Sequence, residues 1–123
     1  MKKKYNILLA TGGTGGHIFP ALALKEKLEE YGCSVKIAAD SKFAKYHKFD
    51  EDHIFIPSSS FFSKDPIKLA GIFFTLAKGF IKALWHIYRY NPDVVMGFGG
   101  YATYPTMLAA IVFKKEIILH EAN

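Results

Sequence analysis

The sequence predicts an α/β fold of the Rossmann-like class, in which helices cover both faces of a parallel sheet. Short β-rich runs alternate with helical patterns along the chain, and the longer runs are apolar enough to be buried on both sides. Glycine-rich turns follow two of these runs. A chain of 123 residues forms one domain at most, and no segment repeats internally.

Five runs are the candidate strands of this sheet. They are residues 5–10, 34–39, 53–56, 93–96 and 116–119. Parallel strands need crossover connections, and such connections are right-handed almost without exception. The helical segments between the runs are therefore expected to cross over the faces of the sheet.

The first predicted helix covers residues 18–31. Charged residues occupy one side, and the apolar residues at helical spacing are Ala21, Leu24, Leu28 and Tyr31. Gly32 follows as a left-handed stop. Cys33, between this stop and the next strand, is expected to be a small core residue.

The second predicted helix covers residues 66–90 and combines a basic stripe with a wide apolar arc. The basic residues of the stripe, counted from just before the helix, are Lys64, Lys68, Lys78, Lys82, His86 and Arg89. The arc is wider than one sheet contact requires, and the longest uncharged run, 69–77, is shorter than the roughly 20 residues of a membrane-spanning helix. This favours a helix lying in a membrane interface. The alternative is a helix packed between the sheet and a neighbour, with the lysines in solvent.

The first glycine turn, residues 11–17 (TGGTGGH), lies between a strand and a helix. Its glycines allow positive φ, and the free N–H groups at the helix start attract an anion, so that a diphosphate is a suitable ligand. The spacing matches neither a P-loop nor a dinucleotide loop. The glycines could instead serve only a tight connection. The imidazole of His17, at the mouth of the turn, could accept a proton near neutral pH.

The second glycine turn, residues 97–101 (GFGGY), follows the strand at 93–96 and opens on the same edge of the sheet. Two such turns at neighbouring strand ends favour one shared anionic ligand, such as a pyrophosphate. The alternative is again a tight crossover turn.

Composition narrows the class of partner. The net charge of +5 and the 15% aromatic content favour an anionic surface, and we expect no nucleic-acid partner. The single cysteine excludes an internal disulfide and a cysteine zinc cluster, which indicates a reducing compartment. The basic start at residues 1–4 is followed by too short an apolar run for a secretion signal.

Three motifs in order resemble the MurG glycosyltransferases, which make lipid II for bacterial cell walls. They are residues 12–20 (GGTGGHIFP), 91–101 (NPDVVMGFGGY) and 120–123 (HEAN). The resemblance extends over essentially the whole chain. It implies the N-terminal half of a GT-B glycosyltransferase, here residues 1–123, which binds the acceptor and the membrane. The C-terminal donor-binding domain is then absent, and a fragment, a split gene or a truncated reading frame is expected.

The implied reaction moves N-acetylglucosamine from UDP-GlcNAc to lipid I, with inversion at the anomeric carbon. The acceptor atom is the 4-hydroxyl of the muramic acid sugar, which is attached to an undecaprenyl-pyrophosphate carrier. The implied location is the cytoplasmic face of the bacterial inner membrane, where the protein docks peripherally on an anionic surface. Two alternatives stay open. One is an acceptor-binding subunit that needs a separate donor-binding chain; the other is a non-catalytic remnant.

The resemblance also implies roles for individual residues. His17 and Glu121 are the expected catalytic residues. The donor-binding residues are Thr14, Gly15, Gly16 and Asn123. The residues expected to bind the acceptor pyrophosphate are Gly13, Gly99, Gly100 and Tyr101. The membrane-docking residues are Phe73, Phe74, Lys78, Phe80, Ile81, Lys82, Trp85 and Arg89. Residues 103–107 are bulkier than the small, glycine-containing loop that the family pattern predicts there.

We expect no metal and no other cofactor. His120 and Glu121 are adjacent at a strand end and point to opposite sides, and no second histidine follows at helical spacing. Positioned N–H donors and helix ends can instead stabilise the leaving UDP.

Overall fold

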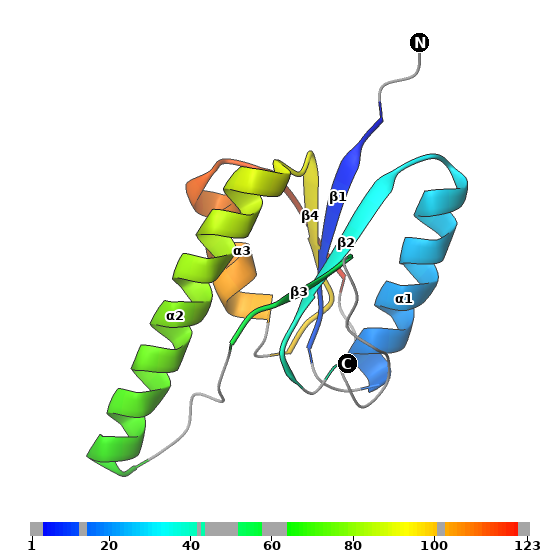
Figure 1. Ribbon diagram of the computed structural model, residues 1–123. Helices are drawn as coiled ribbons and strands as arrows, with labels where there is room; N and C mark the ends of the chain where they lie inside the picture. Colours follow the sequence, from blue (N-terminus) through cyan, green and yellow to red (C-terminus); the bar gives the residue numbers. More distant parts are fainter. Residues whose placement is uncertain are drawn as a thin grey trace.

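The computed structural model describes residues 4–12, 15–41, 43, 52–57, 64–100 and 103–120. Five strands form one parallel sheet in the order β3-β2-β1-β4-β5 (Figure 1). Their bounds are β1 Asn6–Ala10, β2 Ser34–Ala39, β3 His53–Phe55, β4 Val94–Gly97 and β5 Glu116–Leu119. Each agrees with its predicted run to within one residue at either end, and the predicted Rossmann-like class is confirmed.

The order of the strands reverses at β1. The chain leaves this central strand toward β2 and β3 on one side, then returns to β4 and β5 on the other. In the parallel register, Ala10 pairs with Ala38 of β2 and with Gly97 of β4. The carboxyl ends of β1 and β4 therefore lie side by side at a topological switch point, where open α/β sheets bind their ligands.

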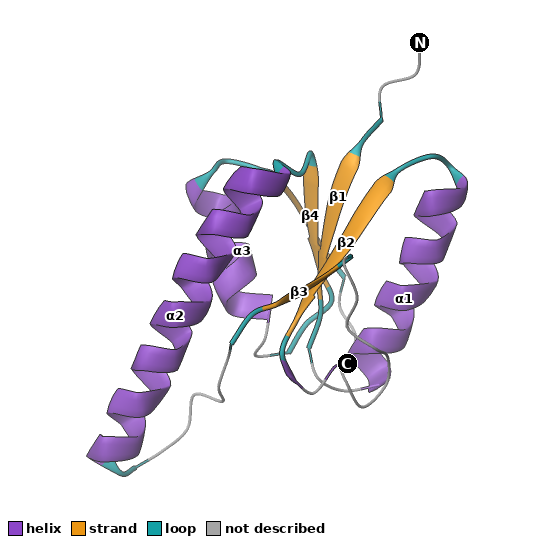
Figure 2. Cartoon of the chain, in the orientation of Figure 1, coloured by secondary structure: helices purple, strands orange, loops and turns teal. Residues whose placement is uncertain are grey.

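Helices cover both faces of the sheet (Figure 2). On one face, α1 (Gly15–Glu30) packs Ile18 and Ala21 against Leu9 and Ile37. On the other, α2 (Pro66–Tyr90) and α3 (Thr103–Val112) pack against alternate strand residues. The buried members of this second cluster include Leu8, Ala38, Ala83, Ile87 and Ala110. The alternation along each strand thus produces two apolar layers, as period-2 geometry requires.

α1 begins three residues earlier than predicted and ends at Glu30. Leu24 and Leu28 pack against the core, as expected. The prediction for Tyr31 was wrong, because this residue follows the helix and its side chain is 78% exposed. Gly32 has φ +89° and confirms the predicted left-handed stop. Past this stop the N–H of Cys33 donates to the Leu28 carbonyl at 3.1 Å, and Cys33 is partly buried against the core.

α2 has the predicted bounds, because both of its ends carry strong signals. The Asp65 carboxylate accepts a hydrogen bond from the Ile67 N–H at 3.0 Å, and Pro66 occupies the first helical position. Asn91 ends the helix with φ 51°, and its N–H donates to the Ile87 carbonyl. With 25 residues, α2 is about 37 Å long, and its N-terminal half projects past the sheet (Figure 1).

α3 is the helix that the sequence did not reveal. The family pattern predicts a small, glycine-containing loop at residues 103–107, but these residues form the first half of the helix. The helix has no charged residue, and six of its ten residues are buried, so no polar face interrupts the apolar pattern. Pro105 is tolerated because it lies in the first turn.

Candidate active site

The two glycine turns meet backbone to backbone at the switch point. A Cβ at Gly12 would lie 2.8 Å from the Gly99 carbonyl oxygen and 3.0 Å from the Gly100 Cα. Gly99 and Gly100 have φ +97° and +90°, in the left-handed region that favours glycine. The glycines at these positions therefore permit a contact between the two turns that any side chain would block.

His17 lies in the first turn of α1, and its half-buried imidazole packs on both glycine turns. Its Nδ1 is 3.1 Å from the position that a Cβ would take at Gly12, and its Nε2 is 3.2 Å from the same position at Gly99. The predicted catalytic residue and two predicted pyrophosphate-binding residues are thus brought together. Since α1 starts at Gly15, the positive end of its dipole lies at the same edge of the sheet.

The N-terminus of α3 reaches this edge as well. Thr103 anchors the second turn through its hydroxyl, which donates to the Gly100 carbonyl at 2.8 Å, while its N–H donates to the same oxygen at 3.2 Å. Sequence reasoning missed this residue. A threonine three residues after a glycine pair, just before Pro105, was the available signal for a helix start.

β5 delivers His120, the first residue of the His-Glu-x-Asn motif, to the same edge. The His120 N–H donates to the Gly97 carbonyl at 2.8 Å, and its ring packs on Phe98 with the centroids 5.2 Å apart. The buried Phe98 side chain in turn belongs to the α1 face of the core. Three chain segments after β1, β4 and β5 therefore converge at one end of the sheet.

Several predicted site residues lie outside the described residues: Gly13, Thr14, Tyr101, Glu121 and Asn123. Gly15 and Gly16 form the start of α1, and Gly16 is exposed. Within the described ranges, no group of three His, Cys, Asp or Glu side chains could hold a metal ion.

A second surface runs along α2. Four of the predicted docking side chains are largely exposed: Phe73, Phe74, Ile81 and Trp85, between 56% and 67%. We call these four, with Lys78, Lys82 and Arg89, the docking surface. Phe80 is different, because it is partly buried and packs against the core cluster of this face.

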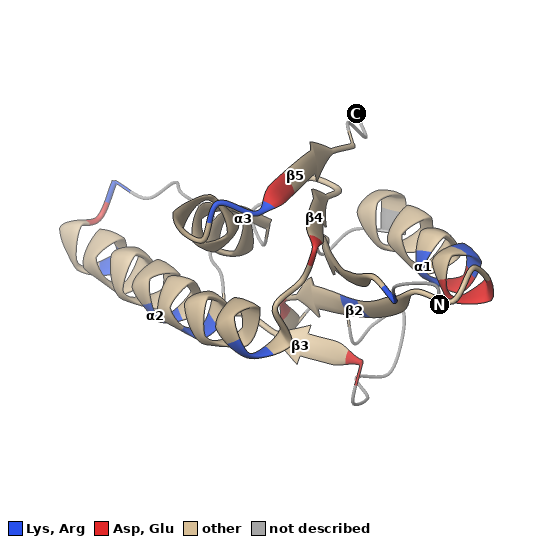
Figure 3. Cartoon of the chain, turned by 90° about the horizontal axis from the view of Figure 1, so that it is seen from above, with Lys and Arg blue, Asp and Glu red and all other residues tan. Residues whose placement is uncertain are grey.

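Basic residues flank the exposed apolar stripe, and residues 66–90 contain no Asp or Glu (Figure 3). The Lys78 ammonium lies 5.5 Å from the Phe74 ring centre, and the Arg89 guanidinium lies 5.3 Å from that of Trp85. Cations and aromatic rings therefore alternate along one side of the helix. Among the described residues, no helix is long and apolar enough to cross a membrane.

Comparison with solved structures places the fold. MurG of Acinetobacter baumannii superposes with a TM-score of 0.76 at 27% identity, over 95% of this chain and 35% of that one. SnogD, a glycosyltransferase of Streptomyces nogalater, gives a TM-score of 0.70 at 18% identity and supports the fold alone. The sheet has the strand order 3-2-1-4-5, and the glycine turns lie at its switch point. The fold is therefore that of the Rossmann-like N-terminal half of a GT-B glycosyltransferase.

Sequence comparison gives the family. The glycosyltransferase family 28 N-terminal domain matches residues 7–123, and the chain belongs to this family. A relative from Rhizobium rhizogenes is 47% identical over 119 residues, and one from Bartonella henselae is 39% identical over 125. Both bear the name UDP-N-acetylglucosamine–N-acetylmuramyl-(pentapeptide) pyrophosphoryl-undecaprenol N-acetylglucosamine transferase. The predicted resemblance to the MurG transferases is confirmed.

The match covers 95–100% of this chain but only 32–33% of these relatives. The chain thus spans about a third of their length.

Proposed function

We propose that this chain is the acceptor-binding and membrane-docking half of a transferase that moves N-acetylglucosamine from UDP-GlcNAc to lipid I. One observation carries the proposal: the contact of both glycine turns with the His17 imidazole at the switch point. The relatives' names supply the substrates. The remaining donor contacts belong to a donor-binding domain, either in a longer chain or in a partner chain.

In this proposal the backbone N–H groups of the glycine turns and the N-terminus of α1 hold the acceptor pyrophosphate. Gly13 and Tyr101 extend this site, while Thr14, Gly15, Gly16 and Asn123 face the donor. The acceptor is a neutral hydroxyl bound to an anionic carrier, so a cradle of N–H donors beside an imidazole suits it.

His17 acts as the general base. As the acceptor oxygen bonds to the anomeric carbon, its proton passes to the imidazole, and the bond to UDP breaks with its electron pair leaving on the phosphate oxygen. Attack from the face opposite UDP inverts the anomeric centre. Glu121 assists on the acceptor side. No metal is required for these steps.

Membrane docking uses the α2 surface. Its N-terminal half projects past the edge of the sheet that carries the glycine turns (Figure 1), so a membrane-borne acceptor and this edge can meet. The proposal omits Phe80, because its ring packs on the core. The location that follows is peripheral, at the cytoplasmic face of the inner membrane.

Docking is tested by vesicle binding of Phe74→Ser. Phe74 is 67% exposed, and removing its ring should weaken binding to vesicles of anionic lipid about tenfold. Tyr31→Ser is the matched control, since Tyr31 is 78% exposed but follows α1 on the other face of the sheet. If both variants lost vesicle binding equally, or if neither lost it, the docking surface would be contradicted.

Chemistry is tested by transfer of labelled GlcNAc to lipid I after the chain is mixed with a donor-binding domain. We expect His17→Ala to lower turnover by about 10²- to 10⁴-fold without changing vesicle binding, with the exposed Glu26→Gln as control. Transfer only on mixing indicates an obligate donor-binding partner. No transfer with or without that domain indicates a non-catalytic remnant. Unchanged turnover in His17→Ala excludes His17 as the general base.

A further inference from the structure

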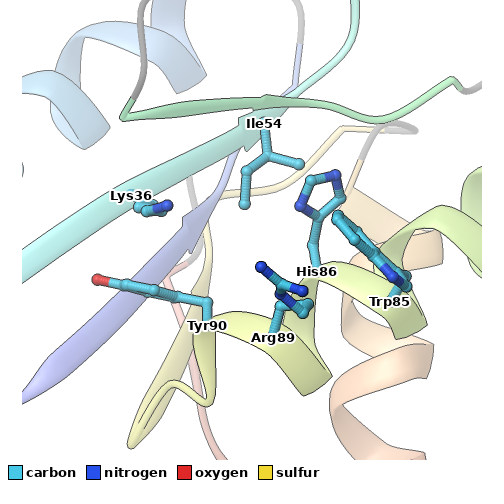
Figure 4. A pocket seen from close by; sticks show the side chains of 6 residues that line it. All are labelled: Lys36, Ile54, Trp85, His86, Arg89 and Tyr90. Carbon is cyan, nitrogen blue, oxygen red and sulfur yellow. The ribbon is translucent and has the colours of Figure 1, made fainter.

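A hollow of about 330 Å³ lies between the last turns of α2 and the strands β2 and β3, away from the glycine turns. Its polar lining includes two cations and an imidazole (Figure 4): Lys36 comes from β2, and Arg89 and His86 come from α2. Tyr90, Trp85 and Ile54 complete the wall. Neither the mechanism nor the motifs of the glycine turns use these residues.

Three features mark this hollow as an anion site. Within the described residues, none of Lys36, His86 and Arg89 takes part in an ion pair. The Lys36 ammonium is held 5.0 Å from the Tyr90 ring centre, and the Tyr90 hydroxyl is fixed by Ser34 at 2.9 Å. Burial lowers the pKa of His86, and the positive charges of Lys82 and Lys36 lower it further. An anion here would relieve this repulsion.

The hollow continues into an apolar groove. Trp85 and His86 line both. The groove has a volume of about 630 Å³, and its other lining residues are Phe55, Pro57, Ile81, Lys78 and Lys82. Lys82 lies 4.8 Å from the Phe55 ring centre. A cationic hollow beside an apolar groove complements a molecule with an anionic head group and an apolar chain.

We propose that this pair of hollows binds one anionic phospholipid, with its phosphate among Lys36, His86 and Arg89 and part of an acyl chain along Phe55, Ile81 and Trp85. The proposal rests on the docking of α2 at a membrane, because the groove opens on the same surface. It adds a stoichiometric lipid site to what would otherwise be a diffuse contact.

The test is a titration of the 123-residue chain with a short-chain phosphatidylglycerol below its critical micelle concentration. We expect saturable one-to-one binding that Lys36→Gln and Arg89→Gln each weaken by about fivefold. Lys68→Gln is the matched control, since it removes the same charge from α2 but lines neither hollow. Binding of the lipid should also raise the pKa of His86, followed by NMR of its imidazole.

The outcomes separate the possible sources of the phosphate. Inorganic phosphate binding as tightly as the lipid would overturn the acyl-chain part and with it the lipid assignment. Absence of saturable binding, or equal losses in Lys36→Gln and Lys68→Gln, would overturn the site. Lys36 is on β2 and outside the docking surface, so Lys36→Gln should still bind vesicles. If Phe74→Ser loses vesicle binding but still binds the short-chain lipid, both proposals are supported. If Phe74→Ser still binds vesicles, only the docking proposal is contradicted.

Discussion

At the scale of single residues, the contact between the glycine turns depends on Gly100. Its φ is +90°, and a Cβ there would lie 2.8 Å from the Gly12 Cα. Gly32 has nearly the same backbone, with φ +89°, but no atom within 4 Å of a Cβ. We expect Gly32→Ala to cost only the left-handed strain, about 1 kcal/mol, and Gly100→Ala to cost about 2 kcal/mol more. Denaturant unfolding of both variants measures the difference, and equal losses would contradict the contact.

A second single residue, His86, makes the free energy of unfolding depend on pH. Its pKa is lowered in the folded chain, first by burial and then by Lys82 and Lys36, so the unfolded chain binds more protons below the ordinary value of about 6.5. The folded state therefore loses stability as the pH falls through that value. Arg89 and Tyr90, also from α2, line the same hollow as His86. We expect His86→Gln to flatten this part of the unfolding free energy between about pH 7 and 5; an unchanged slope would contradict the lowered pKa.

At the scale of elements, α2 is fixed against the sheet through Gly79. A Cβ at Gly79 would clash with the Pro57 carbonyl oxygen, whereas a Cβ at Gly71, in the projecting half, would have nothing within 4 Å. Gly71→Ala should therefore raise the free energy of unfolding by about 0.5–1 kcal/mol through helix propensity. Gly79→Ala should lower it by about 1–3 kcal/mol, because the helix must move away from the segment that follows β3. Thermal unfolding checks both signs, and stabilisation by both would show that α2 does not pack this closely.

Prediction of the elements succeeded where local signals were strong. The predicted bounds of α2 are correct, and Pro66 and Asn91 mark its two ends in the structure; the strands followed from their apolar runs. α3 was missed because a ten-residue helix without charge lacks amphipathic periodicity. Tyr31 was assigned to the helix because periodicity alone does not mark the last turn, although Gly32 was known to end it.

The candidate site shows the same division between local and long-range information. The glycine turns and His17 were found from their order along the sequence, and strand adjacency explains why they meet. The anchoring of Gly100 by Thr103 and the Phe98–His120 contact could not be predicted, since they depend on how α3 and β5 pack. The cationic hollow was also missed, because Lys36 and Arg89 are 53 residues apart and join only through the fold.

At the scale of the whole molecule, apolar side chains are exposed on α3 and on the outer strand β5. Leu108, Ile111, Val112, Ile118 and Leu119 are all at least half exposed. Such a patch beside an open strand edge favours association. We expect the isolated 123-residue chain to self-associate at micromolar concentration, and Leu108→Glu with Ile111→Lys to reduce this in sedimentation experiments. Unchanged sedimentation would locate the association elsewhere.

In the proposed function, the paired glycine turns hold the pyrophosphate of a lipid-linked acceptor beside His17. Its most direct test is an NMR titration of the chain with a short-chain polyprenyl pyrophosphate. We expect saturable shifts at the amides of Gly12, Gly99 and Gly100 and at the His17 imidazole. Shifts confined to Lys36, His86 and Arg89, or no saturable shifts at the glycine turns, would contradict it.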